Sequence, residues 1–310
     1  MKHYSLYCSF FLIFSLSASC VKEILLISPQ ISDELIVNGI IKAYEPIGIT
    51  LTKQIEISSV KTNPIDSASV ILLLKNDIII DTLGFSVNRY CSDQVAIPGN
   101  QYSVQRINSD DVHLYARTLV PDSVSDIICE FTAGRLFDEY GEPITESFIT
   151  ITDDENEDDY YLLYLGEYSD STFSTYSYAA YWQLNDPVLI NEGILEYNPS
   201  YFVFSDELFK GEPYTLHINY HVGYSYNGVG YFPIPAFCVI QRISEEYYFF
   251  MKSFLRHKYN QQYIDYSRFD PMELLLKGQP IELYTNIDNG LGIFASYAES
   301  LKAFEFIPIK

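Results

Sequence analysis

Apolar and polar residues alternate with a period of two through most of this chain. The stretch IGITLTKQIEI at 47–57 is typical: its odd-numbered positions are apolar except Lys53, and its even-numbered positions are glycine or polar. Successive side chains of a β-strand point to opposite faces of the sheet, so this pattern predicts a half-buried strand. Because the pattern recurs along the chain, we expect a mostly β protein.

The first third of the chain carries several such segments. ELIVNGII precedes the stretch above, SVILLLKNDIIIDTL follows it and folds back at Lys75–Asp77, and the polar turn NSDD separates QYSVQRI from DVHLYARTLV. Short strands with turn signals at this spacing are typical of a β-sandwich. Residues 20–120 are therefore predicted to form an immunoglobulin-like or transthyretin-like β-sandwich domain.

A second β-rich domain is predicted for residues 121–310. The stretch LVPDSVSD indicates a linker, and the strand-like segments SFITITDD, YYLLYLGEY, YFVFSDELF and YTLHINYHVGYSY follow it. The 28 tyrosines and 20 phenylalanines of the chain agree with a strand-rich fold.

One segment of this second domain has helical periodicity. SEEYYFFMKSFLRHKYNQQY places aromatic residues and Met251 at spacings of three and four, Ser244 can cap its start, and basic residues gather towards its end. An amphipathic helix is therefore predicted at about 244–262, with its aromatic stripe in the core.

The N-terminus predicts a lipoprotein signal peptide at residues 1–19. The uncharged run LYCSFFLIFSLSAS is shorter than the roughly 20 residues that span a bilayer, and it ends in small residues before Cys20. Cys20 is the predicted lipidation site, because several acyl chains on one residue anchor a protein stably. Ordinary cleavage that leaves Cys20 as a plain thiol is the alternative.

The net charge of the chain limits the classes of partner that it is expected to bind. Without residues 1–19 the chain has 18 basic and 41 acidic residues, a formal charge of −23, because Lys2 is the one charged residue removed. Nucleic acids and anionic lipid surfaces are bound through Lys and Arg, so nucleic acid is excluded as an expected partner. The expected contact with a membrane is the lipid anchor, and no cofactor is expected.

Three cysteines remain after processing and lipidation. Cys91, Cys129 and Cys238 are an odd number without a close pair, which is not the pattern of a disulfide framework. Cys238 lies in the apolar run AFCVIQ and is predicted to be a buried thiol. A Cys91–Cys129 bridge is left open, because sequence does not show proximity.

The acidic run TDDENEDDYY at 152–161 is the densest group of potential ligands. Read as a calcium loop from Asp154, it supplies Asn156 and Asp158, but Asp159 stands where such a loop needs glycine and Leu165 where it needs glutamate. A solvated acidic turn is favoured, and calcium binding is the alternative.

No catalytic residue is predicted. HExxH, GxSxG and Walker-type sequences are absent, and NGLG at 289–292 indicates a turn. His217 and His221 are four positions apart in a strand, roughly 13 Å, which is too far for one zinc ion.

Two segments rich in tyrosine, serine, glycine and asparagine are candidates for a ligand or partner surface. They are residues 168–182 and 220–232, and such mixtures provide rigid amphipathic contact area in binding sites. The candidate residues are Trp182, Tyr224, Tyr226 and Tyr231. The alternative is that these tyrosines line the outer face of an ordinary sheet.

Blocks along the whole mature chain resemble one family. They are ELIVNGII, ITLTKQIEI, ITDDENEDDYYLL, VFSDELFKGEPYTL, ISEEYYFFMKSF and, most specific, YTNIDNGLGIFASY. The chain is identified by them as a member of the Bacteroidota lipoproteins with domain of unknown function 4249. The resemblance implies an outer-membrane lipoprotein with no established enzymatic activity, often encoded beside a TonB-dependent transporter. CVKE resembles the signals for the cell surface.

The expected function is that of a non-catalytic outer-membrane lipoprotein, exposed at the cell surface, that assists a TonB-dependent transporter or captures its ligand, a peptide or a glycan. A structural or adhesive surface lipoprotein is the second reading. A hydrolase with an unrecognised carboxylate site is the third.

Overall fold

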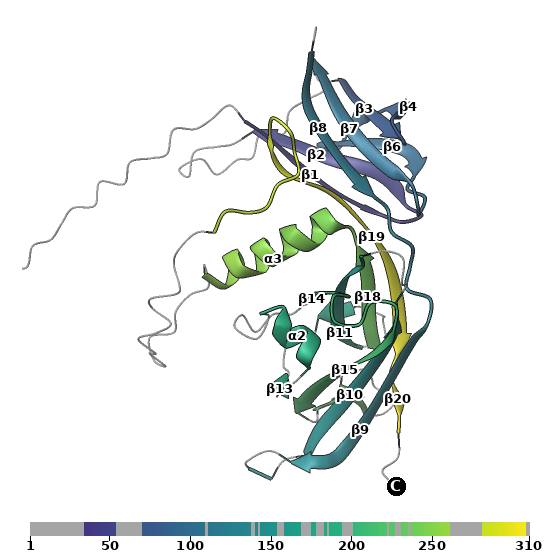
Figure 1. The fold of residues 1–310 in the computed structure, drawn as a ribbon, viewed down its shortest axis with the longest axis vertical. Coiled ribbons are helices and arrows are strands. Elements are labelled where there is room, and N and C mark those ends of the chain that lie inside the picture. The colour runs from purple at the N-terminus through teal and green to yellow at the C-terminus, as the bar shows by residue number, and fades with distance from the viewer. Residues whose placement is uncertain are drawn as a thin grey trace, which may run out of the picture. The chain divides into compact units, whose positions relative to one another are not determined.

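The computed structural model describes residues 34–53, 70–108, 111–137, 140–141, 143–153, 158–168, 175–177, 183–184, 186–193, 201–221, 223–226, 231–234, 237–260 and 281–307. The predicted signal peptide and Cys20 lie outside these residues. The described part is mostly β, as predicted (Figure 1).

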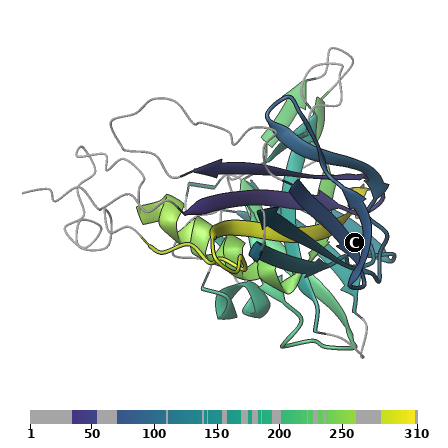
Figure 2. The same cartoon turned by 90° about the horizontal axis from the view of Figure 1, so that it is seen from above.

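A nine-stranded sheet connects the early and the late parts of the chain. Its hydrogen-bonded order is β12 (Thr175–Ser177), β11 (Tyr160–Tyr168), β18 (Phe237–Ile243), β19 (Leu291–Ala303), β1 (Leu35–Lys42), β2 (Pro46–Lys53), β6 (Arg89–Val95) and β5 (Gly84–Ser86), with β14 (Phe202–Ser205) paired to β11. The first described strand, β1, runs parallel to β19, as the purple and yellow ribbons of Figure 2 show.

The parallel pairing of β1 with β19 requires a glycine at position 292, where the two backbones approach closely. Gly292 has a φ of +102°, and a Cβ there would lie 1.9 Å from the Val37 carbonyl oxygen. Gly292, the second glycine of NGLG, therefore allows β19 to begin beside β1. The turn before it is at Asn289, whose φ is also positive.

A second sheet covers the β1–β2 half of the nine-stranded sheet. Its order is β4 (Ile78–Thr82), β3 (Val70–Lys75), β7 (Gln101–Asn108) and β8 (Asp111–Leu119). The predicted reversal between β3 and β4 occurs at Asn76 and Asp77, which both have positive φ as a tight hairpin turn requires. Buried residues of both sheets, such as Val37, Ile49, Leu73 and Val104, form one core. The two packed sheets form a sandwich-like arrangement, in agreement with the predicted fold class, and Ile287, Phe294 and Ala298 from the C-terminal part of the chain contribute to its core.

A third sheet packs against the other half of the large sheet. Its order is β13 (Gln183–Leu184), β15 (Pro213–His221), β10 (Pro143–Thr152), β9 (Ile127–Phe137) and β20 (Glu305–Phe306). Its core cluster takes residues from β9, β10 and β15 on one side and from β11, β14 and β18 on the other. Residues 120–126, within the predicted linker, have no regular secondary structure. The predicted domain boundary at 120 stays a prediction, because β1 and β19 pair across it.

The predicted helix is α3 (Glu245–Asn260), which follows β18 directly. Ser244 caps it, with its Oγ accepting a bond from the Tyr247 N–H at 3.4 Å. Met251 and Leu255 are its buried residues, whereas Phe250 and Phe254 of the predicted stripe are half-buried and stack on each other. The face that turns inward is therefore centred on the Met251–Leu255 line.

A short second helix, α2 (Pro187–Asn191), was not predicted from the sequence. Asp186 caps it, accepting bonds from the N–H groups of Val188 and Leu189, and Pro187 occupies its first turn. Lys252 of α3 binds Glu192 at the end of α2 with Nζ 2.6 Å from Oε2. The two helices are thereby joined at the side of the large sheet.

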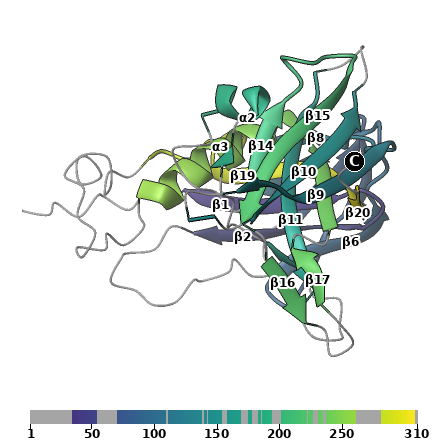
Figure 3. The ribbon, with the colours of Figure 1, turned by 90° about the horizontal axis from the view of Figure 1, so that it is seen from below.

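A hairpin of β16 (Gly223–Tyr226) and β17 (Tyr231–Ile234) completes the described elements (Figure 3). Among the described helices, none is long and apolar enough to cross a membrane.

Candidate functional site

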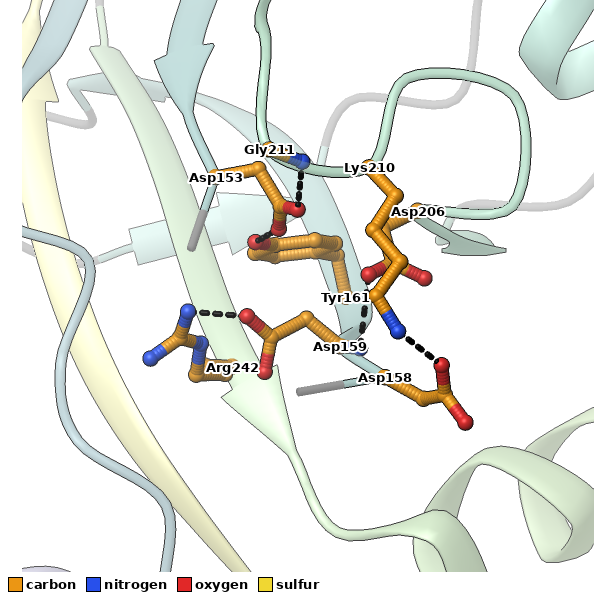
Figure 4. Close-up of polar contacts among 8 residues, drawn as sticks. All are labelled: Asp153, Asp158, Asp159, Tyr161, Asp206, Lys210, Gly211 and Arg242. Atoms are coloured by element: carbon orange, nitrogen blue, oxygen red, sulfur yellow. Dashed lines mark hydrogen bonds and ion pairs between the residues drawn. The ribbon is translucent and has the colours of Figure 1, made fainter. Parts of the chain in front are cut away.

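Three carboxylates gather where β10 ends, β11 begins and β14 ends (Figure 4). They belong to Asp153, Asp159 and Asp206, one oxygen of each lies within 4.8 Å of the others, and each residue is at most 7% exposed. The antiparallel pairing of β11 with β14 puts two of them side by side. The Asp206 N–H donates to the Asp159 carbonyl at 3.0 Å, and the Asp159 N–H donates to Asp206 Oδ2 at 3.0 Å.

Most of the remaining oxygens of this acidic cluster have partners within the chain. Tyr161 donates its hydroxyl to Asp153 Oδ1 at 2.5 Å, and the Gly211 N–H donates to Asp153 Oδ2 at 2.9 Å. The Arg242 guanidinium of β18 forms an ion pair with Asp159 Oδ2. The cluster therefore ties together β10, β11, β18 and the turn after β14.

Burial sets the protonation of the cluster. It raises the pKa of Asp159 to about 7; the Arg242 charge opposes this shift, and the Asp153 and Asp206 carboxylates add to it. Burial also raises the pKa of Asp206, against the bond from the Asp159 N–H. The carboxyl groups of Asp159 and Asp206 are thus easier to protonate than free carboxyl groups, because burial disfavours the charged form and buried like charges repel.

The calcium prediction is not tested by this cluster. Asp154 and Asn156 lie outside the described residues, and Asp158 is exposed and paired with Lys210. The cluster instead uses the flanking Asp153 and Asp159, with Asp206 added from a distant segment. Carboxylate oxygens suit Ca²⁺, but those of Asp153 are both hydrogen-bonded and Arg242 already neutralises Asp159. The observed contacts are those of a structural cluster.

A cavity of about 460 Å³ adjoins the cluster. Its described lining contains no lysine or arginine. Five of the lining residues are acids: Asp122, Asp158, Asp159, Glu245 and Glu246. Burial raises the pKa of Glu246, although hydrogen bonds to its carboxylate, one of them from Thr118, oppose the shift. The cavity therefore holds two acids with raised pKa values, Asp159 and Glu246, which sequence reasoning did not single out.

The tyrosine candidates are only partly described. Trp182 lies outside the described residues. Tyr226 stands directly opposite Tyr231 in the β16–β17 register, and Tyr224 is two positions before Tyr226, so the three occupy positions on one face of the hairpin.

The segment 168–182 includes β12 of the large sheet, and the chain enters that sheet again at Phe237, five residues after the segment 220–232 ends. Ser177, the last residue of β12, and Phe237, the first of β18, are both register partners of Gly166 on β11, on its two sides. A Cβ at Gly166 would lie 2.1 Å from the Phe237 ring, so glycine is needed at this junction. That the two segments form one surface stays a prediction.

The family model described as "Domain of unknown function (DUF4249)" matches residues 22–303. The chain belongs to this family. No curated protein and no solved structure matches it. The DUF4249 match spans both predicted domains and includes the acidic cluster, the cavity and the hairpin.

His217, considered above as a zinc ligand, has a different neighbour in this DUF4249 protein. Its Nε2 lies 3.5 Å from Glu146 Oε1 on β10, and its ring stacks on Phe148. Glu146 stands between Thr132 and Asn219 in the β9–β10–β15 register. Each of these three buried residues has an oxygen without a hydrogen-bond partner. The half-exposed histidine thus lies beside this buried polar row, two positions before Asn219 on the same strand.

Proposed function

We propose that this protein is a non-catalytic lipoprotein of the outer membrane, anchored through Cys20 and exposed at the cell surface. There it assists a TonB-dependent transporter or captures the ligand that the transporter imports. The signal-like residues 1–19 and the resemblance to Bacteroidota lipoproteins support the location and the partner. A structural or adhesive surface role is the alternative within the same location.

The observation that carries this proposal is the β16–β17 hairpin. Neither strand pairs with another strand in the described part of the chain, so the outer edges of this ribbon have no described strand partner. Unpaired strand edges are sites where a partner can add a strand, and tyrosines supply much of the energy of protein interfaces. Tyr224, Tyr226 and Tyr231 combine both features in one short element.

The acidic cluster supports a binding role over a catalytic one. Asp153 is hydrogen-bonded through both oxygens, and Asp159 is held by Arg242. Residues held in this way fix the backbone around the cavity, and they have little freedom to act on a substrate.

The cavity favours one second candidate, a hydrolase. Glu246 lines the cavity outside the ion-paired cluster, and burial raises its pKa, which is the direction that a general acid needs. In this reading, Glu246→Gln abolishes hydrolysis of a glycoside or peptide while the fold persists. Wild-type protein without activity on panels of both substrate classes would eliminate the candidate.

Affinity capture from detergent-solubilised outer membranes tests the binding role. The double variant Tyr224→Ser, Tyr226→Ser is compared with wild type and with Tyr140→Ser, which alters a tyrosine that is 81% exposed at the β9–β10 turn. We expect the double variant to bind the transporter at least about thirtyfold more weakly and to recover correspondingly less of it, because one interface aromatic contributes about 2 kcal/mol or more. The control should capture as wild type does.

Two results would contradict the proposal. One is equal capture of the transporter by all three proteins. The other is a loss of capture that accompanies unfolding, measured by the urea midpoint, because the tyrosines would then support the fold instead of a partner.

A further inference from the structure

Cys129 and Cys238 lie in facing sheets of the same core. Cys129 is on β9 and Cys238 is on β18, each is 1% exposed, and both belong to the core cluster between the large sheet and the five-stranded sheet. Both thiols are free in this structure, and the neighbouring Cys129 thiol contributes to the raised pKa of the Cys238 thiol. The two side chains are thus neighbours in one buried core.

The fold explains how two sheets come close enough for these side chains to be neighbours. Packed sheets are about 10 Å apart, whereas a disulfide requires Cα atoms about 4.4–6.8 Å apart. At this corner one strand serves both sheets: Lys302 of β19 is the register partner of Cys238, and three residues later Glu305 of β20 is the partner of Glu130 on β9 (Figure 1). The passage of β19 into β20 therefore closes the gap beside the two cysteines.

The remaining cysteine is in a different environment. Cys91 is exposed on β6, where its register partners are Gly48 and Gly84. The neighbour that the structure gives Cys129 is Cys238 and not Cys91, the partner considered from the sequence. Cys91 supplies an internal control, because its thiol is open to reagents.

We propose that Cys129 and Cys238 form an inter-sheet disulfide when the protein meets a disulfide oxidant, as exported proteins do. The thiolate of one cysteine attacks a sulfur of the oxidant R–S–S–R and releases one thiol R–SH after protonation. The second thiolate then attacks the mixed disulfide, which forms the Cys129–Cys238 bond and releases a second R–SH. Two electrons pass from the protein thiols to the oxidant, and two protons go to the released thiols.

Burial determines when this reaction occurs. It raises the pKa of the Cys238 thiol, and the neighbouring Cys129 thiol adds to the shift, so the reactive thiolate is scarce in the folded protein. The disulfide therefore forms during folding, while the two sulfurs are open to the oxidant. Once the sheets have closed, the same burial protects it from reductants.

Peptide mapping of the full-length protein, purified from membranes and alkylated before any reduction, tests the inference. We expect one linked peptide pair containing Cys129 and Cys238, with Cys91 alkylated. The map identifies each cysteine separately, so its result is independent of whether Cys20 carries lipid. Alkylation of both Cys129 and Cys238, or a linkage of either one to Cys91, would overturn the proposal.

Refolding of the purified chain supplies the second measurement. Refolding with oxidised glutathione should produce a form whose melting temperature is roughly 5–15 °C above that of the reduced form, because the bond closes a loop of about 110 residues. Cys129→Ala and Cys238→Ala should each abolish this difference, and Cys91→Ser should retain it. A difference that persists in Cys129→Ala, or that is absent from wild type, would contradict the assignment.

Discussion

The Asn286 side chain pairs with the Phe294 backbone in both directions. Its Oδ1 accepts a bond from the Phe294 N–H at 3.0 Å, and its Nδ2 donates to the Phe294 carbonyl at 2.7 Å. The same Nδ2 donates to the Arg117 carbonyl on β8 at 3.0 Å. One side chain of the YTNIDNGLGIFASY block thus joins β19 of the large sheet to the facing four-stranded sheet.

Asn286→Ala should lower the free energy of unfolding by about 2–3 kcal/mol, because three hydrogen bonds are lost and each contributes about 1 kcal/mol. Urea unfolding measures the change. Asn286→Asp retains the acceptor but turns a carboxylate oxygen toward the two carbonyl oxygens, so it should be at least as destabilised as the alanine variant. Stability of the alanine variant within about 0.5 kcal/mol of wild type would show that water replaces these bonds.

Asp159 should make stability depend on pH. Its pKa is about 7 in the folded protein and about 3.9 in an unfolded chain, so the folded state binds the proton more tightly. Its stabilising effect is fully present below about pH 4 and is lost as the pH rises through 7. The three-unit difference corresponds to at most about 4 kcal/mol.

Urea unfolding between pH 4 and 8 measures this effect. Wild type should lose more stability over this range than Asp159→Asn, which has no carboxyl at this position. Asp93→Asn, at an exposed position of β6, should follow wild type. Parallel curves for wild type and Asp159→Asn would mean that the Arg242 pair keeps Asp159 ionised throughout.

Cys20→Ala should release the protein from the membrane fraction, because the acyl chains would have no attachment site. Fractionation of cells, together with labelling by radioactive palmitate, measures the change. Wild type should carry label and sediment with membranes. A Cys20→Ala protein that stayed fully membrane-bound, beside a wild type without label, would refute the lipoprotein prediction.

Local pattern predicted the elements of this fold well. Alternation located β2, β3, β7 and β8, and spacing and capping located α3, because these signals arise from neighbours in sequence. Asp186 followed by Pro187 is a helix-start signal of the same kind and would have located α2. The inward face of α3 was less predictable, because Phe254 and Leu255 lie three and four positions after Met251 and both fit the spacing of a helix face.

Long-range contacts have no comparable signal. Nothing local indicates that β1 pairs with β19, or that Asp206 joins Asp153 and Asp159 of the acidic run. The proximity of Cys129 to Cys238 also depends on the corner formed by β19 and β20. Such pairs are fixed by sheet order, and a single sequence does not encode that order in any short window.

The most direct test of the binding role is site-specific photo-crosslinking in intact cells. A photoreactive amino acid replaces Tyr226 of the hairpin in one strain and Val87, which is 93% exposed at the β5–β6 turn, in another. The account predicts a crosslink to a TonB-dependent transporter from position 226 and none from position 87. Equal crosslinking from both positions, or none from position 226 at equal incorporation, would contradict it.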